Sequence, residues 1–206
     1  MVTDLASHQL RNGARGIAYR AQQLTNVAIL QNRVGVARIL NLESLSNEGH
    51  RRIVVTTLSN ALIESALANA RTLAFFLHER RREADLHYSH FIPEWADDVS
   101  TVTGRAIGTI SEYLSHSQVG SRDPLEHVHP GEWPVGELAL VLVSGVNRLV
   151  SALGSDQQAW FEHMPSTYEG LMSADFRSVA TQLSQNPKVR QMTEDLQSYL
   201  SDHTNL

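Results

Sequence analysis

Histidines are concentrated in the middle of this chain, and one of them closely follows an arginine. Six of the ten histidines lie between residues 78 and 129. Four residues separate Arg82 from His87, so a helical turn or a turn-like loop would place a permanent cation beside a group that titrates near neutral pH. Such a pair suits RNA cleavage without a metal ion, because imidazole moves the 2′-hydroxyl proton while guanidinium stabilises charge on the phosphate. We therefore predict Arg82 and His87 as catalytic residues.

Four charged residues that precede Arg82 in the sequence are candidates for a binding surface. Arg80 and Arg81 continue the arginine run, where their alternative role is to complement the dipole of a helix C-terminus. Glu64 and Arg71 fall two turns apart on one helical face, beside an apolar stripe. They could pair with each other, join a partner helix or simply face solvent.

The loop histidines also allow a metal site as an alternative. Histidine pairs and a nearby carboxylate are ligands that zinc accepts. The residues concerned are His87, His90, His127 and His129, with Asp85 or Glu126. Short histidine pairs in loops are common by chance, and the paired Glu-x-x-His motifs of a di-iron bundle are absent from the sequence. We therefore predict no metal and no cofactor.

Helical periodicity extends through the chain, and no alternating strand of convincing length is present, so the sequence predicts an all-α fold. The first two helices should form a long antiparallel hairpin, with Ser46 or Asn47 as the second N-cap. Asn186 and Pro187 should begin the last helix. The predicted helices span about residues 14–42, 49–81, 100–114, 134–153, 156–163, 167–185 and 187–200. We expect a helical-bundle core over residues 1–154 and a C-terminal helical extension, packed on it, over residues 155–206.

Composition limits the function classes. The chain has 206 residues and no cysteine, which excludes disulfides, thiolate metal sites and a cysteine nucleophile. Glycine-rich phosphate loops, dinucleotide fingerprints and the Gly-x-Ser-x-Gly and His-Glu-x-x-His motifs are also absent. The net charge is −5, yet residues 1–92 carry +4 and residues 93–206 carry −9. This division favours either mutual attraction of the two parts or a local RNA-binding surface. We expect a cytoplasmic protein without a membrane span.

Four segments carry a resemblance to a known group of proteins. They are ARTLAFFL at residues 70–77, DLHYSHFIPEW at 85–95, ISEYLSHS at 110–117 and WPVGEL at 133–138. Residues 62–153, which hold these segments, resemble bacterial all-helical proteins loosely related to the HEPN-like superfamily. The resemblance implies a helical bundle, frequent homodimers and, in active members, an Arg-x(4–6)-His ribonuclease motif at a dimer cleft. Arg82 and His87 fit that spacing.

His116 is a second candidate catalytic residue within this resemblance. Glu112 stands one helical turn before it, where a carboxylate orients an imidazole or caps the helix. Arg122 lies downstream as a possible cation for His116. We therefore expect an RNA-binding protein that cleaves RNA without metal, and the alternative is a non-catalytic helical module that dimerises or binds a protein partner.

Overall fold

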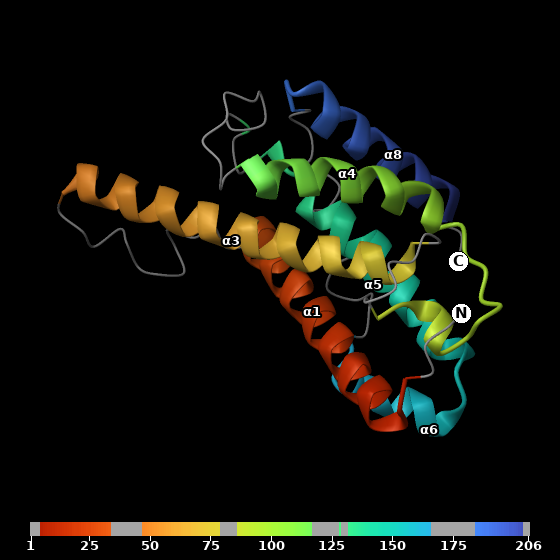
Figure 1. The fold of residues 1–206 in the computed structure, drawn as a ribbon. Helices are drawn as coiled ribbons and strands as arrows, with labels where there is room; N and C mark the ends of the chain where they lie inside the picture. Colours follow the sequence, from red (N-terminus) through yellow and green to blue (C-terminus); the bar gives the residue numbers. More distant parts are fainter. Residues whose placement is uncertain are drawn as a thin grey trace.

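The computed structural model describes residues 5–33, 47–78, 86–116, 128, 132–165 and 184–203. Its regular elements in this part of the chain are all helical, which confirms the predicted all-α class. Figure 1 shows the long helices crossing one another in a bundle. The helices are α1 (Ser7–Arg33), α3 (Glu48–Leu77), η2 (Tyr88–His90), α4 (Ser100–His116), α5 (Val135–Ala152), α6 (Ser155–Gln158), η5 (Ala159–Phe161) and α8 (Pro187–His203).

α5 is the central helix of the bundle. α1, α3 and α8 all pack against it, and thirteen of its residues are buried. Pro134 is its N-cap, and the carbonyl oxygen of Pro134 accepts a hydrogen bond from Leu138 N–H at 2.9 Å. The apolar stretch at residues 138–143 is therefore helix, as its period predicted, and its side chains form the middle of the core.

α1 begins earlier than predicted, at Ser7 instead of Ala14. The helix continues through Gly13, whose missing side chain lets Leu86 pack closely over it, because a Cβ atom there would lie 2.6 Å from Leu86 Cδ2. The buried face of α1 then follows the helical period and packs on α3 and α5. The predicted end of this helix, near residue 42, lies outside the described residues.

α3 is packed only along its second half. Asn47 caps it as predicted, and Asn47 Oδ1 accepts a hydrogen bond from His50 N–H at 3.1 Å. Ile63 is the first buried residue, and none of residues 48–62 is buried. Figure 1 shows this first half, which we call the α3 arm (residues 48–62), projecting beyond the other labelled helices. α1 packs against α3, and Figure 1 shows the two helices crossing at an oblique angle with opposed directions. The loop that was predicted to join them in a hairpin lies outside the described residues.

α3 also ends earlier than predicted, at Leu77 instead of Arg81. His78 is extended, with φ −84° and ψ 141°, and its carbonyl oxygen contacts the His87 ring. The His78 ring lies 3.3 Å from Thr103 Oγ1 on α4. These contacts turn the chain out of the helix.

α8 lies on α4 and α5, as Figure 1 shows at the edge of the bundle. Asn186 caps it as predicted, because its Oδ1 accepts hydrogen bonds from Lys188 and Val189 N–H at 3.0 and 3.3 Å. The apolar stripe of α8 is buried within its own chain. The helix predicted at residues 167–185 lies almost wholly outside the described residues, and the division of the chain at residue 154 remains a prediction.

Two of the described helices, α3 and α5, are long and apolar enough to cross a membrane by length and composition alone. The apolar window of α5 is 67% buried within the bundle, which is typical of a core helix, whereas that of α3 is 28% buried.

Candidate functional site

An ion pair joins α5 to the segment that enters α4. Arg148, near the end of α5, donates from Nε to Asp97 Oδ2 at 2.6 Å and from Nη2 to Asp97 Oδ1 at 2.8 Å. Asp97 Oδ1 also accepts a hydrogen bond from Val99 N–H at 2.9 Å. The Asp97 side chain is only 8% exposed, and the guanidinium matches the carboxylate through two parallel bonds. Arg148 thereby fixes the start of α4 on the central helix.

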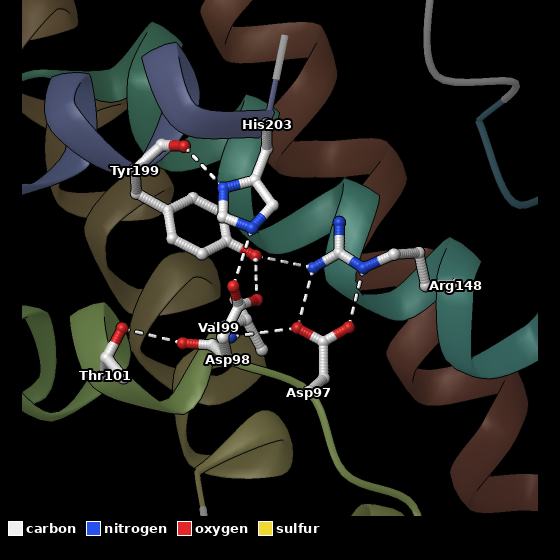
Figure 2. A network of polar contacts seen from close by, with 7 residues as sticks. All are labelled: Asp97, Asp98, Val99, Thr101, Arg148, Tyr199 and His203. Atoms are coloured by element: carbon white, nitrogen blue, oxygen red, sulfur yellow. Dashed lines mark hydrogen bonds and ion pairs between the residues drawn. The ribbon is translucent and has the colours of Figure 1, made fainter. Parts of the chain in front are cut away.

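Asp98 links the same segment to the end of α8, as Figure 2 shows. Asp98 Oδ1 accepts a hydrogen bond from the Tyr199 hydroxyl at 2.9 Å, and Oδ2 lies 2.6 Å from His203 Nε2. The Tyr199 hydroxyl accepts in turn from Arg148 Nη2 at 2.8 Å. The rings of Tyr199 and His203 stack with centroids 4.1 Å apart. Asp97, Asp98, Arg148, Tyr199 and His203 thus form one polar network.

The network changes the acidity of its members. His203 Nδ1 faces the Tyr199 carbonyl oxygen at 2.7 Å and Nε2 faces Asp98, so two acceptors raise the pKa of His203 against the opposing effect of burial. Burial would raise the pKa of Asp97, but the Arg148 and Val99 hydrogen bonds outweigh it and lower that pKa. Burial and the hydrogen bond to Asp98 raise the pKa of Tyr199. The ordinary state at neutral pH therefore includes an ionised Asp97 and a neutral Tyr199.

A cleft of about 590 Å³ opens beside this network. The rings of Tyr88 and Trp95 form two of its walls, with centroids 5.0 Å apart and planes at 63°. Glu94, Asp97 and Asp98 line it too, and its described lining contains no basic side chain. Its volume is in the range of small-molecule sites. Aromatic faces beside carboxylates suit a positively charged group.

The structure gives His87 a structural role. The residue is 3% exposed, and both ring nitrogens are engaged. Nδ1 accepts a hydrogen bond from Ser89 N–H at 3.2 Å, which leaves the proton on Nε2 to donate to the His78 carbonyl oxygen. A general base must reach its substrate, so this conformation gives His87 no access to an RNA 2′-hydroxyl. The catalytic role of His87 therefore stays a prediction, and its ring is enclosed in this conformation.

The other predicted site residues are not brought together by the described part of the chain. Glu64 and Arg71 lie on α3 as predicted, but they form no ion pair there. Glu64 is close enough to Tyr113 that its charge, together with burial, raises the pKa of that phenol. Glu112 pairs with Lys188 of α8. His116 ends α4, and its side chain lies outside the description, as do the whole of Arg80, Arg81, Arg82, Arg122, His127 and His129.

The histidine metal site, which the sequence allowed as an alternative, has no counterpart among the residues that the structure describes, where no three His, Asp or Glu side chains lie close enough to hold an ion. His90, one of the proposed ligands, instead accepts a hydrogen bond at Nδ1 from His87 N–H at 3.1 Å. His127 and His129 lie outside these residues.

Sequence reasoning missed the polar network because its members are far apart along the chain. Asp97 and Arg148 are 51 positions apart, and Asp98 and Tyr199 are 101 apart. One local signal was available. Arg148 is the only charged residue in the second half of α5, and such a residue needs a partner if it is partly buried.

Comparisons with protein-family models, curated proteins and solved structures found no match for this chain.

Proposed function

We propose that this protein binds single-stranded RNA along the outer face of α1. Over its 27 residues α1 carries four arginines and no aspartate or glutamate. The net charge of the whole chain is −5, so this helix is a basic element on an acidic protein. Phosphate groups would meet no repelling carboxylate on the helix itself, and arginine suits phosphate better than lysine does.

The observation that carries the proposal is an exposed aromatic ring beside two arginines. His8, Arg11, Arg15 and Tyr19 follow one another at steps of three or four residues, and all four are exposed. Tyr19 is 62% exposed, which is unusual for so large an apolar ring. Guanidinium groups hold the phosphates of a single strand, and an unstacked base can lie on the phenol face.

The contacts among the described residues leave this face available. Arg15 lies 3.6 Å from Glu162, but both side chains are about half exposed, and such pairs are weak. Arg20 is on another side of the helix, where Nη1 donates to Asn69 Oδ1 of α3 at 3.1 Å. Arg11 and Arg15 are therefore the arginines of α1 that we assign to phosphate contacts.

The proposal covers binding and not cleavage. His87 is enclosed, and Arg82 and the His116 side chain lie outside the described residues. The metal-independent ribonuclease remains a prediction from the resemblance and the Arg/His spacing.

Salt dependence of RNA binding tests the proposal. Each phosphate contact contributes about −0.7 to the slope of log affinity against log salt for a single strand. We expect Arg11→Gln with Arg15→Gln to make the slope shallower by about 1.4, and Tyr19→Ala to weaken binding by about tenfold at one salt concentration. Arg105→Gln, which breaks an exposed pair with Asp195, is the matched control and should leave the slope unchanged. Equal slopes for the α1 double variant and the control would contradict the proposal.

The α3 arm favours a second candidate, the predicted non-catalytic homodimer. Val55 and Leu58 follow the helical period along the arm, yet both remain only half-buried. Antiparallel pairing about a two-fold axis would place this stripe against the same stripe of a second copy, so we commit to self-association. Light scattering should give twice the monomer mass of 22.9 kDa, and Leu58→Asp should halve it. A monomeric wild-type protein at high concentration would exclude this candidate.

A further inference from the structure

The cleft beside α4 combines three features. Two aromatic rings, Tyr88 and Trp95, form a corner with their planes at 63°. Carboxylates border that corner, and the rest of the wall is largely apolar, with Leu77 and Pro93 among its residues. This surface differs from the basic α1 face in both charge and chemistry.

The carboxylates of the cleft are not equally available. Asp97 is neutralised by the two hydrogen bonds from Arg148. Asp98 is bound by Tyr199 and His203 on one side, but its side chain is still 53% exposed. Glu94 is exposed and has no ion pair among the described residues. Among the described residues, Glu94 is therefore the cleft carboxylate for which no counter-ion is seen.

We propose that this cleft binds an organic cation of the quaternary ammonium type, with the ammonium in the Tyr88–Trp95 corner and Glu94 as its counter-charge. An ammonium that carries methyl groups cannot donate hydrogen bonds, so it is weakly hydrated and is attracted to aromatic faces. The apolar wall accommodates the methyl groups, and Glu94 and Asp98 supply negative potential. An anionic ligand would be repelled by the same carboxylates. This site is independent of RNA binding by α1.

The neutral analogue of choline separates cation binding from simple apolar binding. 3,3-Dimethyl-1-butanol has the shape of choline without the charge. The probe is the indole N–H signal of Trp95 in NMR spectra of the full chain, identified by its loss in Trp95→Phe. Trp133 and Trp160 serve as internal references, because neither lines the cleft. We expect increasing concentrations of choline to shift the Trp95 signal until the site is saturated. We expect the alcohol to bind at least about tenfold more weakly than choline.

Variants locate the counter-charge. Glu94 is exposed, so Glu94→Gln should fold normally and should weaken choline binding about threefold or more, because it removes a charge near the ammonium. Glu48→Gln, at the distant start of α3, removes the same charge and should leave the affinity unchanged. Equal affinity for choline and the alcohol would overturn the proposal. So would a choline response in which Trp95, Trp133 and Trp160 shift together without saturation.

Discussion

Arg148 and Asp97 form the most enclosed ion pair among the described residues, and it joins the central helix to the start of α4 through hydrogen bonds of 2.6 and 2.8 Å. The Arg148 guanidinium continues to Tyr199 of α8. One side chain of α5 thus holds the ends of two other helices. The polar network is consequently a support for the adjacent cleft, whose lining includes Asp97 and Asp98.

Removing the charge of Asp97 should lower the stability of the folded protein. Asp97→Asn keeps the side-chain shape and an oxygen that can accept from Val99 N–H, but it leaves Arg148 without its counter-ion. We expect the free energy of unfolding to fall by about 2 kcal/mol, between the values for exposed and fully buried pairs. Glu112→Gln, which breaks the more exposed pair with Lys188, should cost less than about 1 kcal/mol. Urea unfolding followed by circular dichroism measures the free energy of unfolding of both variants. Equal losses would contradict the stronger contribution that we assign to the Asp97–Arg148 pair.

The sequence predicts those parts of the fold that depend on nearby residues. Asn47 and Asn186 were recognisable as N-caps because the hydrogen bonds of a cap are made within three residues. The period of α5 likewise predicted its buried face. The α3 arm shows the limit of this reasoning, because the stripe of Val55 and Leu58 has the same period whether or not another helix covers it.

The candidate site was less predictable than the fold. His87 was singled out by its distance in sequence from Arg82, but spacing does not reveal burial, and the ring is a structural link to His78. The cleft is assembled from the end of α3, η2 and the segment before α4. Tyr88 and Trp95 are seven positions apart in an irregular segment, so no periodic rule places their rings together.

His203 should make the attachment of α8 dependent on pH. Its pKa is raised by the Tyr199 carbonyl oxygen and by Asp98, while the positive charge of Arg148 opposes the increase. A raised pKa in the folded state means that the stabilisation is fully present below the unfolded value, near pH 6.5, and is lost as the pH rises through the folded pKa. We expect the difference in unfolding free energy between wild type and His203→Gln to be largest in that acidic range and to shrink at higher pH.

Asp98→Asn provides the control for this pH dependence. It removes the carboxylate that faces His203 Nε2 while it retains an acceptor oxygen for the Tyr199 hydroxyl. The stabilisation by protonated His203 should then weaken, and the variant should show a flatter pH profile than wild type. Stability curves for wild type and His203→Gln that run parallel from acid to alkaline pH would show that His203 contributes no such effect.

Two glycines of the bundle should respond oppositely to replacement by alanine. At Gly145 of α5 a Cβ atom would lie 2.9 Å from Leu77 Cδ1 and 3.3 Å from Val99 Cγ2, so Gly145→Ala must push these side chains apart. We expect a net loss of about 1 kcal/mol, since crowding outweighs the better helix propensity of alanine. Gly108 of α4 is exposed with no atom within 4 Å of such a Cβ, so Gly108→Ala should gain about 0.5 to 1 kcal/mol. Thermal unfolding of the two variants checks whether Gly145→Ala lowers and Gly108→Ala raises the stability of the folded protein.

The two halves of α3 should differ in what they contribute to stability. Leu67 is fully buried in the packed half, so Leu67→Ala should cost about 2 to 5 kcal/mol through lost burial and a cavity. Leu58 is half-exposed on the arm, and Leu58→Ala should cost less than about 1 kcal/mol in the monomer. If a second copy covers the arm, the Leu58→Ala cost must grow with protein concentration, because association stabilises the folded state by mass action. Denaturant curves at two concentrations a hundredfold apart measure this, and a cost that stays constant would count against the homodimer.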